Sequence, residues 1–247
     1  TKTPVVLPTK TPAKNGETII SETVNADVLT TDALTTDALT TDALTTDALA
    51  TDAPATDAPE TISLIGLRHE WQTWNNCGPA TLATYLSYYG DAPGQAQIGG
   101  VLRRSEDDKN VSPEELHAYA VERGMRAILR VNGSSELLRT LVSNGYPVLI
   151  ETWLEEQPND GMGHYRLVTG YDDVRQAWIL YDSYVATNLV DAGGKDGTGD
   201  YAGIWGDYVQ TEAWWKVFNR TWLLVYPPED EAKIQTLLGK QYTEDQW

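Results

Sequence analysis

The chain has 247 residues and a formal net charge of −18, and this acidic balance argues against nucleic acid or an anionic membrane as a partner. No apolar stretch approaches the roughly 18 residues that a membrane-spanning helix needs, so no membrane insertion is expected. A single cysteine, Cys77, excludes an intrachain disulfide and a multi-thiolate metal centre, and no cofactor or metal is expected.

Residues 1–61 are predicted to form a disordered low-complexity stalk. Residues 21–61 hold nine acidic side chains and no basic one, and a Thr-Thr-Asp-Ala-Leu unit recurs there. Its period of five residues matches neither helix nor strand, and each repeat buries too little to offset its chain entropy. A short β-solenoid is the alternative. This composition is typical of an exported bacterial protein, which predicts an extracellular or cell-surface location with tethering through the stalk.

Residues 62–228 are long enough for one domain with its own core, and their hydrophobic pattern changes from helical to strand-like along the chain. The first half is predicted to hold helices and one short strand, at residues 77–90, 112–124, 126–131 and 135–144. Ser112 and Glu115 match a capping box, with Pro113 at the first helical position.

The second half is predicted to be mainly strands, at residues 147–153, 164–171, 177–181 and 221–226. A glycine-rich loop is expected at residues 191–203, and an amphipathic turn around Trp214 and Trp215. Helices followed by antiparallel strands predict an α+β domain. Residues 229–247 are predicted to be a helical tail, either the start of a helical repeat region or a simple end.

Cys77 is predicted to lie in the first turn of the first helix, where thiols react readily. The partial positive charge and unpaired N–H groups of a helix N-terminus favour the thiolate over the thiol. Asn75 or Asn76 is the expected cap of this helix. Helix placement alone leaves Cys77 open to the alternative of a small buried hydrophobe.

A thiol nucleophile needs a base, a group that orients the base, and donors for the oxyanion. His164 opens a predicted strand, and a hairpin turn near residues 173–174 places it opposite a residue between Asp182 and Tyr184. Asp182 is then within reach of one imidazole nitrogen, although a turn role for Asp182 stays open. Gln72, five residues before the cysteine, is a candidate oxyanion donor or a surface amide. His117 is expected to be a partly exposed surface residue.

The chain resembles a known family, the C39-like cysteine peptidases of papain-like fold, and in particular their soluble secreted branch. Four blocks in order carry the resemblance, within a similarity that runs from Leu64 to Tyr226: Gln72 with Cys77-Gly78-Pro79-Ala80, Gly163-His164-Tyr165, Gly170-Tyr171-Asp172-Asp173, and Tyr181-Asp182-Ser183. The chain has no phosphate-binding Gly-x4-Gly-Lys loop and no membrane domain of the kind fused to the leader-cutting relatives.

The resemblance implies an α+β, papain-like domain in which Cys77 is the nucleophile, His164 the general base and acid, Asp182 the orienting group and Gln72 an oxyanion donor. It further implies a peptide or protein substrate and hydrolysis of peptide bonds. Two alternatives stay open on the same residues. One is a cell-wall amidase or transpeptidase, and the other is a non-catalytic peptide-binding module that keeps the fold.

Overall fold

The computed structural model describes residues 59–184 and 203–243, and within them all strands belong to one antiparallel sheet. The strand order is β2-β7-β3-β4-β5-β6, with β1 paired to β4 outside this path. The strands are β1 (Thr61–Ser63), β2 (Arg126–Arg130), β3 (Val148–Leu154), β4 (Met162–Asp172), β5 (Ala177–Asp182), β6 (Ile204–Asp207) and β7 (Trp222–Tyr226). The predicted stalk at residues 1–61 and the glycine-rich loop at 191–203 lie almost wholly outside the described residues.

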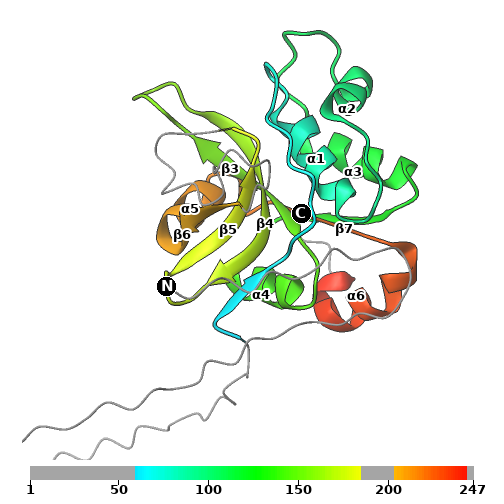
Figure 1. Ribbon diagram of the computed structural model, residues 1–247, viewed down its shortest axis with the longest axis vertical. Coiled ribbons are helices and arrows are strands. Elements are labelled where there is room, and N and C mark those ends of the chain that lie inside the picture. Colours follow the sequence, from blue (N-terminus) through cyan, green and yellow to red (C-terminus); the bar gives the residue numbers. More distant parts are fainter. Residues whose placement is uncertain (1–58, 185–202, 244–247) are drawn as a thin grey trace, which may run out of the picture.

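Helices pack around this sheet. They are α1 (Cys77–Ser87), α2 (Gln95–Leu102), α3 (Pro113–Glu122), α4 (Ser135–Ser143), α5 (Tyr208–Lys216) and α6 (Glu231–Leu238), with short 3₁₀ turns η1 (Pro228–Asp230) and η2 (Gly239–Tyr242). Figure 1 shows α1, α2 and α3 gathered on one side of the sheet and α5 on the other. This arrangement confirms the predicted α+β fold class, with helices packed on an antiparallel sheet.

Most predicted elements are present, and the capping box is confirmed: Glu115 N–H donates to the Ser112 hydroxyl, and the Glu115 carboxylate accepts from Ser112 N–H at 2.8 Å. The prediction missed α2, β1 and β6, and it read α5 as a turn. Gly94 caps α2 without a side-chain bond and two glycines interrupt it, so the local signals of a helix are weak there. Contacts with the neighbouring elements, rather than propensity, stabilise α2.

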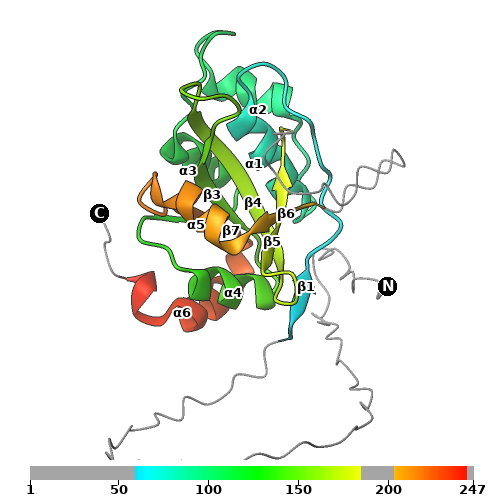
Figure 2. The same ribbon diagram turned by 90° about the vertical axis from the view of Figure 1, so that its left-hand side faces the viewer.

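The last helix, α6, extends the same core. Ile234 and Leu238 are buried, and Lys233 donates to the carbonyl oxygen of Asn144 at the end of α4. Figure 2 shows α6 beside α4 below the sheet. The division of the chain at residue 228, and the continuation of the tail, stay predictions.

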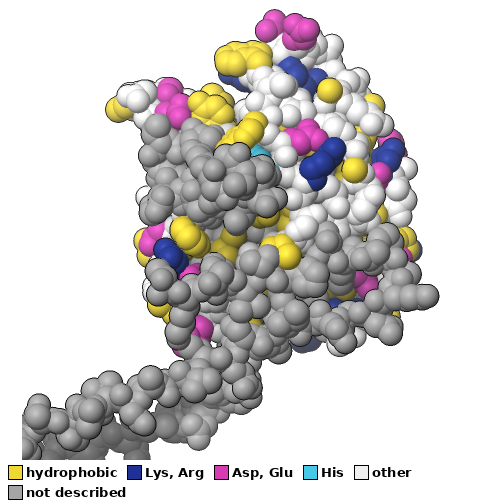
Figure 3. All heavy atoms as spheres, in the orientation of Figure 1, with side chains coloured by type: hydrophobic (Ala, Val, Ile, Leu, Met, Phe, Trp, Pro, Cys, Tyr) yellow, Lys and Arg dark blue, Asp and Glu magenta, His cyan; other side chains and the backbone are white. Residues whose placement is uncertain are grey.

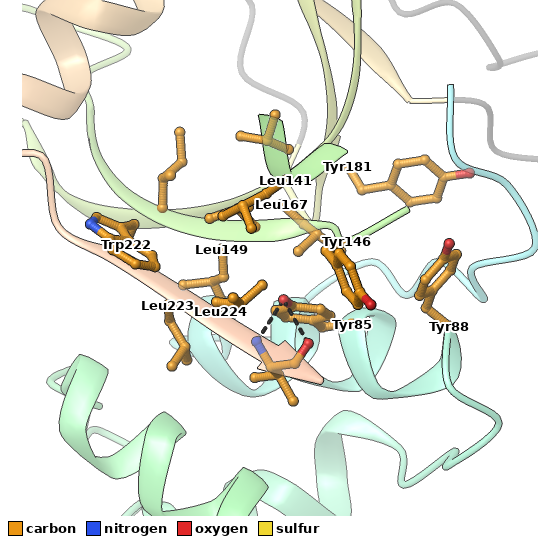
Figure 4. Close-up of a cluster of buried hydrophobic side chains, with 14 of the residues drawn as sticks. Tyr85, Tyr88, Leu141, Tyr146, Leu149, Leu167, Tyr181, Trp222, Leu223 and Leu224 are labelled. Carbon is orange, nitrogen blue, oxygen red and sulfur yellow. Dashed lines mark hydrogen bonds between the residues drawn. The ribbon is translucent and has the colours of Figure 1, made fainter. Parts of the chain in front are cut away.

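Tyr85 connects α1 to the sheet at a position where the strand ladder stops. Pro147 has no N–H, so the β3–β7 pairing ends at Val148 and Leu224. The Tyr85 hydroxyl accepts from Val225 N–H at 2.8 Å and lies against the carbonyl oxygens of Pro147 and Val225 (Figure 4). One buried hydroxyl thus satisfies backbone groups that the sheet leaves unpaired.

We expect Tyr85→Phe to lower the free energy of unfolding by about 1–3 kcal/mol, because Val225 N–H stays buried without an acceptor. Tyr89→Phe is the matched control in the same helix region. The Tyr89 hydroxyl is buried and has no hydrogen-bond partner among the described residues, so its removal is expected to be neutral or stabilising. Urea denaturation of both variants measures the difference, and equal losses would contradict this account.

Candidate active site

Cys77 is the first residue of α1, as predicted, and its side chain is half-buried against the core. Pro79 follows two residues later and is tolerated because the first four N–H groups of a helix have no acceptor within the helix. Gly78 allows close packing, since a Cβ there would lie 3.3 Å from the ring of Tyr165. The helix start is therefore pressed against β4, the strand that carries His164.

Asn76 occupies the N-cap position, but the predicted side-chain cap is wrong. Its amide nitrogen donates to Gln95 Oε1 at 2.9 Å, and its oxygen accepts from Arg103 at 3.3 Å. A Cβ on Gly99 would approach this oxygen to 2.7 Å, so glycine is needed there. The Asn76 side chain thus links the cysteine turn to α2 and makes no capping hydrogen bond to the first turn of α1.

His164 lies near the start of β4 and is buried, with 1 % of its surface exposed. Its Nε2 atom lies 2.7 Å from Asp182 Oδ1. Burial by itself would lower the pKa of His164, but attraction to Asp182 and hydrogen bonds to Asp182 and Cys77 outweigh it and raise the pKa to about 9. The structure therefore brings together the thiol, the imidazole and the carboxylate that the sequence singled out.

The register of the hairpin lies within the predicted range, because its continuation from the Arg166–Asp182 pair sets His164 opposite Tyr184. Asp182 directly opposes Arg166, two residues further along β4, and a bulge between Val168 and Gly170 shifts the pairing beyond it. The carboxylate reaches His164 diagonally across the strand pair.

Asp182 is almost fully buried and holds several donors. Oδ1 also accepts from Tyr184 N–H at 2.8 Å, and Oδ2 accepts from Arg166 Nε at 2.8 Å. Burial would raise the pKa of this carboxyl, but the charges of His164 and Arg166 and these hydrogen bonds lower it to about 2. The carboxylate is therefore ionised at every pH near neutrality.

Gln72 is bound to the residue after Asp182. Its backbone N–H donates to the Ser183 carbonyl oxygen at 2.8 Å, and its side-chain oxygen accepts from the Ser183 hydroxyl at 3.0 Å. This leaves the side-chain NH₂ group as the end of Gln72 that can donate to another acceptor. These bonds hold Gln72 beside the end of β5, the strand that carries Asp182.

Two residues near the site were not assigned a part in it from the sequence. His69 donates from Nε2 to the backbone carbonyl oxygen of Asp182 at 2.7 Å, and burial lowers its pKa. Arg166 pairs with the Asp182 carboxylate. A charged residue in the apolar run of β4, two positions from His164, was the available signal for Arg166. His117 is half-buried and bonds to the Ala127 carbonyl oxygen, a structural role.

Glu151 lies on β3 directly opposite Tyr165, and a Cβ on Gly163 would lie 3.4 Å from its Oε1. Burial, and then the charge of Glu114, raise its pKa to about 7. The folded protein therefore holds this proton more tightly than the unfolded chain. Stability is predicted to fall as the pH rises from about 4.5 to about 7, because charging the folded carboxyl becomes unfavourable.

Glu151→Gln should remove this dependence and raise the unfolding free energy at pH 8 by about 1–2 kcal/mol, a value reduced for the partial exposure of the carboxyl. Denaturant titrations at pH 5 and pH 8 measure the effect. Glu114→Gln, which removes only the neighbouring charge, should give a smaller gain. If the stability gain of Glu151→Gln over wild type were no larger at pH 8 than at pH 5, the raised pKa assigned to Glu151 would be wrong.

Within residues 59–184 and 203–243, no group of three or more His, Cys, Asp or Glu side chains is arranged to hold a metal ion. In the same described part, none of the helices has the length and apolar character needed to cross a bilayer.

The thiol lies at the start of a helix, and the imidazole and the buried carboxylate lie on the antiparallel sheet against which that helix packs. This arrangement resembles the site of papain-like cysteine peptidases. The family model described as "Peptidase_C39 like family" matches residues 65–216, more than half of the chain. The chain therefore belongs to the C39-like peptidase family, as its sequence blocks predicted. No curated protein is a significant match for it.

Solved structures of low sequence identity are similar to the chain. The peptidase domain of Streptococcus ComA, described as a bifunctional ABC transporter involved in quorum sensing, is 14% identical with a TM-score of 0.47, covering 66% of this chain and 99% of that one. A putative C39-like peptidase from Bacillus anthracis is 15% identical with a TM-score of 0.46, covering 66% and 96%. Xylellain, a cysteine protease from Xylella fastidiosa, is 11% identical with a TM-score of 0.48, covering 69% and 87%.

Proposed function

We propose that this protein is a cysteine peptidase that hydrolyses peptide bonds with Cys77 as nucleophile, His164 as general base and acid, and Asp182 as orienting group. The observation that carries the proposal is the imidazole of His164, which bonds to the buried Asp182 carboxylate through Nε2 and to the Cys77 thiol. An imidazole held between a carboxylate and a thiol can take and return a proton without moving.

The proposed reaction begins with transfer of the thiol proton to His164, whose raised pKa keeps the imidazolium protonated at neutral pH. The thiolate attacks the peptide carbonyl carbon, and Cys77 N–H and the Gln72 side-chain NH₂ group donate to the oxyanion. His164 then protonates the leaving amine, which departs as the C–N bond breaks. Finally His164 removes a proton from water, and the hydroxide releases the acyl group from sulfur.

The substrate is proposed to be a peptide or protein. A double glycine motif protease from a transporter, 16% identical to this chain, has a structure in complex with the leader peptide. An extracellular or cell-surface location, with tethering through residues 1–61, is proposed on composition alone.

A trapping experiment tests the proposal. A peptidyl aldehyde should form a reversible adduct with Cys77, visible as a thiohemiacetal by NMR, and a peptide library should be cleaved with inhibition by the same aldehyde. Muropeptides provide the second arm, because a cell-wall amidase on the same residues would turn over muropeptides alone. Absence of both adduct and cleavage would leave the peptide-binding module as the function and reject the peptidase.

A further inference from the structure

Among the described residues, Arg166 is the one arginine or lysine that is buried, and it lies next to the proposed catalytic residues. None of its surface is exposed to solvent. It lies two residues from His164 on β4, so both side chains share a face of the sheet, and it directly opposes Asp182 on β5. Enclosing an arginine is costly unless its charge and donors are matched, so its contacts indicate what it is for.

The guanidinium is held on three sides. Nε donates to Asp182 Oδ2 at 2.8 Å, and Nη1 donates to the Thr152 hydroxyl at 2.5 Å and to the Trp153 carbonyl oxygen at 3.2 Å. The plane lies over the ring of Trp214, 4.7 Å from its centroid. Nη2 is buried without a hydrogen-bond partner in the described part of the chain.

These contacts fix His164 through two routes. Through Asp182, the guanidinium holds Oδ2 so that Oδ1 faces His164 Nε2. Through β3, the Thr152 hydroxyl that accepts from Arg166 donates to the His164 carbonyl oxygen at 2.8 Å. Arg166 therefore helps to fix the position of both the side chain and the backbone of His164.

The charge of Arg166 has a second effect. It neutralises part of the Asp182 charge that His164 feels, and it repels a protonated imidazole directly. The groups facing His164 are Asp182 from β5, Cys77 from α1, Arg166 on its own strand and the ring of Tyr184, 6.4 Å from the imidazole. Of these, only Arg166 opposes protonation by its charge.

We propose that Arg166 is a positioning residue that holds Asp182 against His164 and prevents this carboxylate from binding the imidazole proton too tightly. An imidazole paired with a wholly uncompensated buried carboxylate would keep its proton and protonate the leaving amine poorly. The shared carboxylate lets His164 be oriented strongly and still exchange its proton. The effect on turnover rests on the proposed function, whereas the effect on the titration of His164 does not.

Titration of His164 by NMR, in protein labelled with ¹⁵N histidine, tests the proposal without any substrate. Arg166→Met and Arg166→Gln remove the charge and should raise the titration midpoint of His164 by about one pH unit or more, a tenfold gain in proton affinity. Arg166→Lys keeps the charge and should leave the midpoint near that of wild type. Arg139→Met breaks the Arg139–Asp173 pair outside the site and should leave it unchanged.

A role confined to stability would lower the denaturation midpoint of the neutral variants and leave the titration of His164 where it was, which would overturn the proposal. If neither neutral variant folds, Arg166→Lys decides. A lysine cannot reproduce the fork that binds Asp182 and Thr152, so kcat should fall about tenfold with little change in KM. Unchanged kcat in that variant would equally overturn the proposal. If the titration of His164 shifted but no Cys77-dependent turnover were found, the proposed role of Arg166 would be supported and the peptidase function rejected.

Discussion

Cys77→Ala is expected to abolish turnover, with a loss in kcat of about 10⁵-fold or more, because the acyl group then has no sulfur on which to be carried. Cys77→Ser should be nearly as inactive, since a serine hydroxyl holds its proton far more tightly than a thiol. The folded state should be little affected. The side chain is half-buried and alanine favours a helix, so the unfolding free energy should change by no more than about 1 kcal/mol.

The measurement is cleavage of a fluorogenic peptide selected from the library, together with urea denaturation of each variant. Gly100→Ala serves as the control, because this position in α2 faces open space and should tolerate alanine with full activity. Residual turnover in Cys77→Ala that the peptidyl aldehyde still inhibits would show that another group is the nucleophile. A large loss of stability would show that the thiol is a packing residue, which helix placement alone left open.

Much of this fold could be predicted because its signals are local. The Ser112–Glu115 capping box depends on residues three apart, and the strand runs depend on alternation within a few residues. The Asp182–His164 contact was also within reach, because a short hairpin limits which residues can meet. Membership of the family was predicted from four blocks, all of which lie within the matched residues 65–216.

The remainder depends on contacts between distant segments. Asn75 or Asn76 was expected to cap the helix, yet the Asn76 side chain binds Gln95 and Arg103 of the unpredicted α2 region instead. In the sequence, Arg166 is one charged residue in a largely apolar strand. Its role is evident only from its contacts with Asp182, Thr152 and Trp214. Local propensity carries no information about such partners, because their contribution exists only in the packed state.

Asp182→Asn is expected to damage both activity and stability. The carboxylate accepts from His164 and from Arg166, whereas an amide has only one oxygen and must turn its NH₂ group toward one of these donors. If that group faces His164, it fixes the ring nitrogen as an acceptor and moves the imidazole proton to the side of the thiol. We expect kcat to fall about 10³–10⁴-fold, the scale seen when an orienting carboxylate becomes an amide.

The loss of stability has a separate cause. Removing one partner of a buried ion pair leaves Arg166 with an uncompensated charge, which costs about 3–5 kcal/mol. The pH dependence should change as well. The raised pKa of His164, about 9, means that its pairing stabilises the fold fully below about pH 6.5 and that this contribution is lost as the pH rises through 9. The lowered pKa of Asp182, about 2, means that its contribution is present above about pH 4 and lost as the pH falls toward 2.

Both slopes should therefore be present in the wild-type protein and largely absent from Asp182→Asn, which urea denaturation between pH 3 and pH 10 would measure. Asp173→Asn is the matched control. It breaks a partly exposed, bidentate arginine–carboxylate pair with Arg139, away from the thiol, and should leave kcat and the alkaline slope unchanged. If Asp182→Asn kept the alkaline slope, His164 would owe its proton affinity to another group, and the orienting role of Asp182 would be wrong. Coupled loss of the slope and of kcat would tie the buried carboxylate to both the stability and the chemistry of the site.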